Sequence, residues 1–505
     1  MLDIGNRHAG TAGGALHIGG KPVTVEIRLG RDAYLASVQH TAWMLMNLLC
    51  RLTGSICEIR LSCTTQSLVV SKLSPHIRGG LPLTSALLEG IQAIGTDREG
   101  FVPTKIADEG IAEIIVSVGY EYDPTATFCA IGNGMCGGLF SRVITPPLCT
   151  SNLTVGPYVA ACLAAAEIFR YVRLIDYESQ RQMFLNIVNY NLSSDPTWSD
   201  QDYGCEFPSV LLAGVGAVGT AFLHTLYPLP VLGTIFLADN DPKGIDDTNL
   251  GRYTLFGCDS IGKQKATEAS RLLRGASFST VPHDGGFEHF LDREGALQIL
   301  LSAVDTNEAR HALQERYVPL SFSASTLNLR AEILRCGPPG KGACLSCFNP
   351  IIRYKWTEDD IRTLLLRKPT LMLRLTEKLK LNPTEVIAWI HNRKCSETGE
   401  RLVEELRTDD GAIPAFSVGF VSLLAGTILA AELLKVANGY SGPLNESRNR
   451  AVFQFQNPTA MTNRATFYPR DEQCQACSSQ NVATGIWANR YRQLAAAYSD
   501  QSSEC

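Results

Sequence analysis

The most regular hydrophobic pattern in the chain begins at Ser209. The apolar run SVLLAGVGAVG ends in a glycine turn, and an amphipathic run from Thr220 to Leu226 and a second apolar run, GTIFLADND, follow it. This order is typical of a strand, a turn, a helix and a second strand. A later apolar run, ALQILLSAVD, ends at Asp305, and the long helical pattern FSVGFVSLLAGTILAAELLK follows further on. We therefore expect an α/β domain built on a βαβ unit and closed by a buried helix.

The first part of the chain carries a weaker copy of this plan. The run VTVEIRLG is followed by a helical pattern and then by the strand-like SICEIRLSC. The helical segments AAEIFR at 165–170 and AAELLK at 430–435 are similar, and we interpret them as traces of a degenerate internal repeat. After its first strand this half has only GRD at 30–32, without a glycine fingerprint. We predict that it binds no nucleotide.

Composition narrows the class of partner. The 505 residues carry a formal net charge of -5 with the charges interspersed, so we expect no nucleic-acid partner. No apolar run approaches the roughly 20 residues of a membrane span, and the start MLDIGNRHAGTAGG lacks the build of a signal peptide. We therefore expect a cytoplasmic protein without membrane contact. Its 16 cysteines then serve as metal ligands, nucleophiles or core residues rather than in disulfides.

The glycine turn and the strand after it indicate a nucleotide site. Gly214, Gly216 and Gly219 fit G-x-G-x-x-G, in which missing side chains let the backbone approach phosphates at a helix N-terminus. Asp239 and Asp241 end the next strand, where a carboxylate can accept hydrogen bonds from ribose hydroxyls. These residues are equally compatible with an NAD-dependent oxidoreductase.

Positive charge after the second strand separates ATP from NAD. Asn249 and Arg252 belong to N-L-G-R, and Lys265 ends G-K-Q-K. Cleavage at the α-phosphate of ATP moves negative charge onto pyrophosphate, which fixed cations stabilise, whereas an NAD enzyme does not need them. Asp305, in D-T-N-E-A-R, would hold Mg²⁺ near the phosphates. Each residue alone could be a surface charge or a helix cap, and their joint order favours the ATP site.

In this order, G-x-G-x-x-G, D-x-D, N-L-x-R, G-x-x-K and D-x-N-x-A-R resemble the family of ubiquitin-activating enzymes. This family includes the ThiF- and MoeB-like bacterial enzymes that adenylate sulfur-carrier proteins. The resemblance is strong from about Ser209 to Cys347 and includes the closing helix and the C-terminal cysteines. Two departures concern loops: Tyr253 stands where the family usually has glutamine or another polar residue, and PKG follows Asp241.

The resemblance implies a Rossmann-like adenylation domain preceded by a degenerate, inactive adenylation-like domain. It also implies that Asp241 binds the ribose, that Arg252 and Lys265 bind the phosphates, and that Asp305 binds magnesium. The predicted segments are the inactive domain (1–175), a linker (176–207), the first part of the active domain (208–350), a helical catalytic-cysteine insertion (351–412), the closing helix with the zinc-binding end (413–480) and a C-terminal tail (481–505).

Two C-x-x-C pairs predict a structural zinc site. Cys344 and Cys347 form one pair, and Cys474 and Cys477 form the other. Each pair can supply two thiolates to a tetrahedral zinc ion, and two pairs make a closed site even when they are distant in sequence. A redox dithiol, or two unrelated pairs, is the alternative.

Cys395 is the only cysteine between the first C-x-x-C pair and the closing helix. In the resembling enzymes that form a thioester, the nucleophilic cysteine lies in this interval. Neighbouring Arg393 and Lys394 would lower the pKa of its thiol and stabilise the thiolate. A buried structural cysteine is the alternative.

The resemblance implies ATP-dependent activation of a ubiquitin-like protein with a C-terminal glycine, through adenylation and then a thioester on the enzyme. The product would pass to a conjugating-enzyme-like protein, and the degenerate first half favours a bacterial system, with phage defence as one use. The alternative is an adenylating enzyme of the sulfur-carrier or peptide-modifying type without a thioester step. A non-catalytic binding module and further homodimerisation stay open. In the family an arginine from the opposite half often reaches ATP, and Arg7 and Arg31 are candidates.

Overall fold

The computed structural model describes residues 20–70, 72–96, 98, 100–174, 177–198, 206–291, 297–351, 358–367, 369–392, 397–408, 416–439, 444–445 and 447–501. The chain divides into two compact units. Unit 1 comprises Met1–Pro350 and Phe416–Cys505, and unit 2 is Ile351–Ala415.

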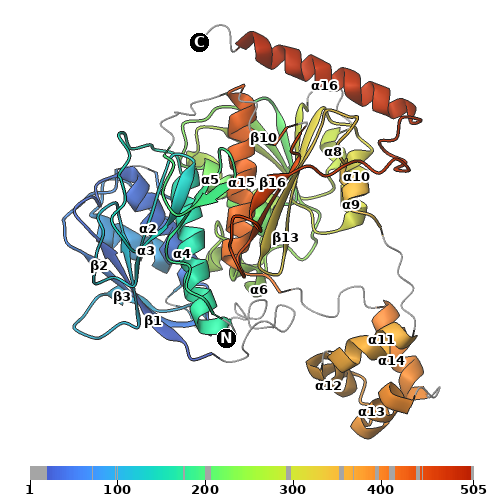
Figure 1. Cartoon of the computed structure of the whole chain (residues 1–505), viewed down its shortest axis with the longest axis horizontal. Helices are drawn as coiled ribbons and strands as arrows, with labels where there is room; N and C mark the ends of the chain where they lie inside the picture. Colours follow the sequence, from blue (N-terminus) through green and yellow to red (C-terminus); the bar gives the residue numbers. More distant parts are fainter. Residues whose placement is uncertain are drawn as a thin grey trace. The chain divides into compact units, whose positions relative to one another are not determined.

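Within the described residues, unit 1 contains two eight-stranded sheets with equivalent strand order (Figure 1). The order is β3-β2-β1-β4-β5-β6-β7-β8 in the first sheet and β11-β10-β9-β12-β13-β14-β15-β16 in the second. In both, the neighbouring pairs up to the fifth strand are parallel and the later pairs are antiparallel. The predicted α/β fold, with two sheets rich in parallel pairs, is confirmed.

The strands of the first sheet are β1 Val23–Leu29, β2 Ile56–Cys63, β3 Thr104–Ile106, β4 Ile114–Val118, β5 Phe128–Asn133, β6 Cys136–Phe140, β7 Met183–Asn186 and β8 Asn191–Ser193. Those of the second are β9 Val210–Ala213, β10 Thr234–Ala238, β11 Ser279–His283, β12 Ile299–Ser302, β13 Leu320–Leu327, β14 Arg330–Cys336, β15 Arg450–Gln454 and β16 Arg464–Thr466. β7 and β8 lie in the segment predicted as a linker. β8 is short and polar, and β7 is apolar and buried but has only four residues, so neither shows the pattern of a longer strand.

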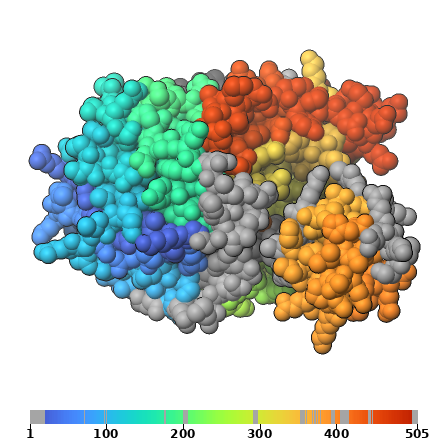
Figure 2. Space-filling view, turned by 60° about the horizontal axis from the view of Figure 1, so that its bottom comes forward, coloured from blue at the N-terminus to red at the C-terminus, as the bar shows by residue number. Residues whose placement is uncertain are grey.

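Four helices, two from each half, join the halves of unit 1. α4 packs against α15, α2 packs on α4, and α5 packs on α15, so one hydrophobic core runs through both halves. On one face the blue-to-green first half and the red C-terminal segments adjoin (Figure 2). The helices of unit 1 are α2 Ala36–Leu49, α3 Leu83–Ile94, α4 Val155–Arg173, α5 Ala217–Leu226, α6 Asp247–Leu250, α7 Lys265–Leu272, α8 Glu288–Leu291, α9 Asn307–Gln314, α10 Leu345–Phe348, α15 Gly419–Ala437 and α16 Val482–Gln501.

The two similar helical segments occupy equivalent places in the two halves. α4 connects β6 to β7, and α15 connects β14 to β15. Each buries an acid and a base three residues apart: Glu167 pairs with Arg170 at 2.7 Å, and Glu432 pairs with Lys435. Lys435 also donates to the carbonyl of Ile187 at 2.8 Å, which ties the second half to the first.

Among the described residues, α4 and α15 have the length and hydropathy of a membrane span. Each has 19 residues, with hydropathies of 1.3 and 1.8, so the expectation that no apolar run approaches a span was too strict. The buried share of the apolar window is 94% in α4 and 89% in α15. These helices are apolar on all sides because other protein elements surround them.

The second sheet is covered on both faces, and the first is not covered to the same extent. β9 and β12 are buried throughout, with one face in the shared core and the other in a second cluster that includes Leu211, Leu300 and Trp487. β1 instead alternates between buried and partly exposed residues, and Glu26 and Arg28 form an ion pair on its polar face. Trp487 belongs to α16, so the predicted C-terminal tail begins as a packed helix.

Unit 2 is a small helical unit with a core of its own. Ile361, Leu365, Val386 and Trp389 are buried in this core, and the Arg362 guanidinium lies 4.5 Å from the centre of the Trp389 ring. Its helices are α11 Glu358–Arg367, α12 Pro369–Lys378, α13 Pro383–Asn392 and α14 Glu397–Thr408.

Candidate active site

The glycine turn joins β9 to α5, and two of its glycines are required by close packing. Gly214 has a φ of +93°, and a Cβ atom there would lie 2.7 Å from the carbonyl oxygen of Ala303. A Cβ atom at Gly219 would lie 2.1 Å from the carbonyl oxygen of Gly214, so a side chain would push the helix off the strand. At Gly216, among the described residues, it would meet the Tyr253 hydroxyl alone, at 3.5 Å. The turn therefore leaves the N-terminus of α5 accessible to a phosphate.

Two aspartates after β10 and a lysine at the start of α7 form a charged cluster beside this turn. The Asp239 carboxylate accepts a hydrogen bond from the Val215 N–H at 2.8 Å, and burial raises the pKa of Asp239. Lys265 Nζ donates to Asp241 at 2.6 Å and lies 4.0 Å from Asp239. Burial alone would lower the pKa of Lys265, but Tyr253 and the two aspartates raise it. The ammonium therefore stays charged, as a phosphate ligand requires.

The structure separates the two lysines of G-K-Q-K. Lys265 is buried and points at the aspartates, whereas Lys263 is half exposed and pairs with Glu268 at 3.2 Å. The two lysines carry the same charge and are two residues apart in the chain, but of the two only Lys265 faces the aspartates. Lys263 is therefore a matched control for the predicted role of Lys265.

Tyr253, which the motif comparison marks only as an unusual residue, faces the glycine turn. It is 4% exposed, and its hydroxyl is the group nearest to Gly216. The Arg252 guanidinium lies 5.6 Å from the centre of the ring, and Lys265 Nζ lies 5.8 Å from it, which are cation–π distances. Burial raises the pKa of Tyr253, so its hydroxyl keeps a proton to donate. The signal that could have found it is an aromatic residue directly after the arginine of N-L-x-R.

Asn249, predicted to bind the cofactor, uses its side chain within its own loop. Its Oδ1 accepts a hydrogen bond from the Asp246 N–H at 3.2 Å, and the Asp246 carboxylate accepts one from the Asn249 N–H at 3.0 Å. This reciprocal pair is a capping box at the start of α6. In the structure, Asn249 therefore holds the loop that carries Arg252.

Asp305 lies at the same edge of the sheet as the glycine turn. It follows β12 and is exposed, and the neighbouring Val304 backbone packs against Gly214. Burial lowers the pKa of Arg310, and the charge of Asp305 opposes that shift, so the two side chains are within electrostatic range. An exposed carboxylate beside a phosphate site fits the oxygen ligands that Mg²⁺ prefers.

The two C-x-x-C pairs converge, although 130 residues separate them in sequence. All four Sγ atoms lie within 4.8 Å of one another, with Cys344 3.7 Å from Cys474 and Cys347 3.8 Å from Cys477. A disulfide would need about 2.05 Å, whereas thiolates bound tetrahedrally at about 2.3 Å from zinc lie about 3.8 Å apart. The set fits zinc. Hydrogen bonds from Cys344 lower the pKa values of Cys347 and Cys474.

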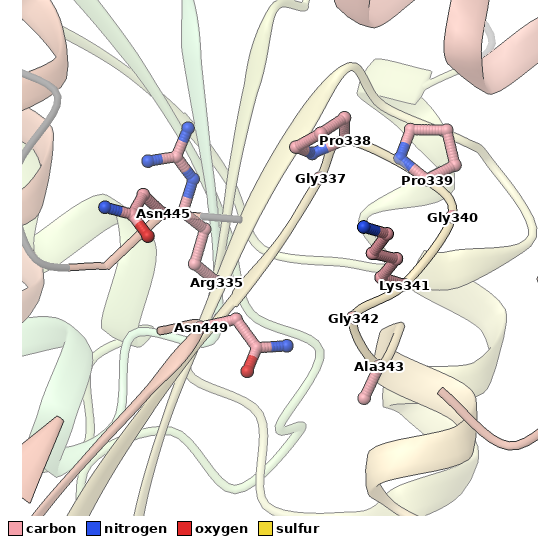
Figure 3. A pocket seen from close by; sticks show the side chains of 10 residues that line it. All are labelled: Arg335, Gly337, Pro338, Pro339, Gly340, Lys341, Gly342, Ala343, Asn445 and Asn449. Atoms are coloured by element: carbon pink, nitrogen blue, oxygen red, sulfur yellow. The ribbon is translucent and has the colours of Figure 1, made fainter. Parts of the chain in front are cut away.

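A separate hollow of about 240 Å³ lies beside the cysteine cluster, on the loop that leads from β14 to Cys344 (Figure 3). Arg335, Lys341 and Asn449 line it together with the glycine-rich loop backbone. Because β14 ends beside the start of β13, this hollow lies at the amino ends of the parallel strands. The glycine turn and the aspartates lie at the carboxyl ends, so the hollow lies at the opposite ends of the strands from the predicted nucleotide site.

The two segments of unit 1 that flank the insertion contact the D-x-N-x-A-R and N-L-x-R motifs. The carbonyl of Pro350, just before the insertion, accepts a hydrogen bond from Asn307 Nδ2 at 3.1 Å. After the insertion, a Cβ atom at Gly419 would lie 3.4 Å from the carbonyl oxygen of Gly251 and 3.6 Å from the Cα of Arg252. Within unit 1, the chain on each side of the insertion therefore lies beside a residue of a predicted motif.

The structure does not place every predicted residue in this geometry. Cys395 and Arg7 lie outside the described residues. Arg31 is exposed in the loop after β1 of the first sheet.

Comparison with known proteins matches residues 205–476 to the model of the ThiF family. An uncharacterized protein of Sinorhizobium fredii, y4jF, is 25% identical over 324 residues, which are 58% of this chain and 61% of that protein. The chain thus spans less than two thirds of this curated relative.

Solved structures of MccB are also similar. The E. coli enzyme has 18% identity and a TM-score of 0.37, with 55% of this chain and 66% of that chain covered. E. coli MccB with ATP has 19% identity and a TM-score of 0.34, with 54% and 66% covered. The family match spans more than half of the chain. It includes the glycine turn, Asp239, Asp241, Lys265, Asp305 and three of the four cysteines of the two C-x-x-C pairs. This chain belongs to the ThiF family.

Proposed function

We propose that this chain adenylates the C-terminal carboxylate of a ubiquitin-like protein that ends in glycine, and then carries that protein as a thioester on Cys395. The observation that carries the first step is the cluster of Asp239, Asp241 and Lys265 at the glycine turn. A buried ammonium beside a phosphate-type turn suits ATP cleavage better than hydride transfer, because ATP cleavage develops negative charge on phosphate. Membership of the ThiF family supports the same choice.

In the proposed first step, a carboxylate oxygen of the partner attacks the α-phosphorus of ATP. The new oxygen–phosphorus bond forms as the bond to the bridging oxygen of the β-phosphate breaks, and pyrophosphate leaves with that electron pair. Lys265 and Arg252 stabilise the charge that pyrophosphate gains, and the N-terminus of α5 holds a phosphate. Asp305 would hold magnesium, which supplies further neutralisation.

In the proposed second step, the Cys395 thiolate attacks the carbonyl carbon of the acyl-adenylate. A carbon–sulfur bond forms, the bond to the adenylate oxygen breaks, and AMP leaves. A cysteine of a conjugating-enzyme-like protein then takes the acyl group by thioester exchange. The contacts of Pro350 with Asn307 and of Gly419 with the Arg252 backbone support this step, because they hold the chain before and after the insertion near residues of the predicted ATP site.

The first experiment tests nucleotide choice. The melting temperature of the full chain is measured with Mg-ATP and, separately, with NAD⁺. Mg-ATP should raise it and NAD⁺ should not. Lys265→Met should abolish the shift, whereas Lys263→Met should keep it, because that lysine pairs with Glu268. A shift with NAD⁺ alone, or equal loss in both variants, overturns the ATP site.

The second experiment tests the thioester. The protein is incubated with ATP and candidate β-grasp proteins and analysed on a non-reducing gel. A thiol-sensitive adduct should form and should disappear with Cys395→Ala, while pyrophosphate exchange persists. Exchange without any adduct in the wild type would instead support the adenylating enzyme that lacks a thioester step.

A further inference from the structure

An arginine from the first half is buried against the loop that carries Arg252 and Tyr253. Arg51 lies two residues after the end of α2, and its guanidinium donates to the carbonyl of Leu250 and, at 2.9 Å, to the carbonyl of Phe256. These carbonyls lie on either side of Arg252 and Tyr253 in the chain. One side chain therefore holds both ends of the segment 250–256, which we call the arginine loop.

Asn47, one turn earlier, completes this clamp. Its Nδ2 donates to the carbonyl of Thr254 at 2.9 Å, and its Oδ1 accepts from Arg51 Nε at 2.8 Å. Together the two side chains satisfy three carbonyls of the arginine loop. Unpaired, each of those buried carbonyls would destabilise the loop conformation, because a buried acceptor without a donor retains its full desolvation cost.

The charge of Arg51 is unusual for its surroundings. The residue is 1% exposed, and among the described residues it donates to uncharged oxygens, those of the Asn47 side chain and of the Leu250 and Phe256 carbonyls. Burial lowers the pKa of Arg51. A buried cation among neutral acceptors is a costly way to stabilise a fold, since apolar side chains fill such space more cheaply. The guanidinium is planar and donates to the Leu250 and Phe256 carbonyls at once, so it fixes the position of one relative to the other.

We propose that Arg51 and Asn47 of the half without a glycine turn are positioning residues for the nucleotide site in the other half. By holding the arginine loop they keep the Tyr253 hydroxyl against Gly216 and the Arg252 guanidinium beside the same ring. This inference rests on the proposed function, because its ligand is Mg-ATP. A loop displaced by about 1 Å can lower activity about 100-fold even when folding is intact.

The test compares two buried hydrogen-bonding residues at the two ends of the same helical segment. Arg51→Met removes the clamp. Gln39→Met is the matched control, because Gln39 is also fully buried but holds Ala33, Leu68 and Val70 in the first half. The dissociation constant of Mg-ATP and the melting temperature are measured for both. Arg51→Met should weaken ATP binding about 10- to 100-fold, and Gln39→Met should change it less than about 2-fold at a similar loss of melting temperature.

Milder variants keep the test decisive if Arg51→Met does not fold. Arg51→Lys can reach one carbonyl and should give an intermediate constant, and Asn47→Ala should weaken binding less than Arg51→Met. If the wild type binds no Mg-ATP, the proposed function fails, and this inference with it. If the wild type binds but the Arg51 and Asn47 variants bind equally well, the positioning role alone is wrong. Equal weakening by Gln39→Met would show a general loss of stability and would also overturn it.

Discussion

The two halves of unit 1 have equivalent strand order, and they differ in the turn that follows β1 in the first half and β9 in the second. In the second half, the glycine turn after β9 leaves the N-terminus of α5 accessible. In the first half, the segment after β1 brings in a carboxylate: Asp32 accepts a hydrogen bond from the Tyr120 N–H at 2.6 Å. A Cβ atom at Gly119 would lie 2.5 Å from Asp32 Oδ1. A carboxylate at this place would repel phosphate, which supports our proposal that the first half binds no nucleotide.

This difference teaches that two halves with the same strand order can differ in the one turn on which the predicted nucleotide site depends. The four-helix contact between the halves depends on apolar faces and buried polar bonds, and it does not require a glycine turn in the first half. The first half also reaches across this contact with Asn47 and Arg51. Its proposed contribution is therefore to position the arginine loop rather than to bind a ligand.

The largest expected effect concerns metal. We expect one zinc ion per chain, and Cys347→Ser should lose it because one of the four thiolates is removed. The effect on stability should be large, because structural zinc contributes free energy on the order of 10 kcal/mol to folding. Amide exchange should then rise around β13, β14 and α16, while β1 and β4 stay protected. Cys336→Ala is the control, because Cys336 is buried nearby but lies outside the four-sulfur set. A wild type without bound metal would contradict the zinc site.

The next effect compares the first glycine after the first strand in each half. Gly214→Ala should weaken Mg-ATP binding about 100-fold, because its φ of +93° and the 2.7 Å approach to Ala303 leave no room for a methyl group. Gly30→Ala should leave binding unchanged, since its Cβ would meet Asp32 Oδ1 at an ordinary 3.4 Å. Calorimetric titration with Mg-ATP measures both. Equal effects at the two glycines would break the comparison.

A third effect tests the contact between the halves. Tyr158 packs against His40 and His224, and burial lowers the pKa of each histidine to about 3. Below pH 6.5 the unfolded chain takes up protons on these groups and the folded chain does not. The free energy of unfolding should therefore fall by about 1.4 kcal/mol per pH unit for each histidine between pH 6.5 and about 3. Urea unfolding at several pH values measures the slope, and a variant His224→Gln with an unchanged slope would contradict it.

The smallest effect sharpens the difference at Asp32. Asp32→Asn should alter stability by no more than about 1 kcal/mol, because burial already raises the pKa of Asp32 and an amide oxygen can accept the same hydrogen bond from Tyr120. The ATP stoichiometry should stay at one per chain. Two ATP molecules per chain would mean that the first half is an occluded site rather than a lost one.

The sequence predicted the elements whose signals are local. The glycine turn, the strand before it and the helix α15 each show their own period or turn residue within one stretch. The first half was predictable as a faint copy for the same reason. Its last two strands were not, because β7 and β8 have only four and three residues, and their pairing partners, more than their own residues, make them strands.

By itself the sequence determined which chemical groups are present and in what order: a phosphate-type turn, acids after a strand, cations beyond them and two thiol pairs. The tertiary structure alone decided which of two neighbouring lysines faces the acids, that Tyr253 joins them, and that Arg51 supports them from about 200 residues away. Local periodicity records only contacts between near neighbours. A hydrogen bond between a side chain and a distant carbonyl leaves no mark on the identity of the residue that supplies the carbonyl.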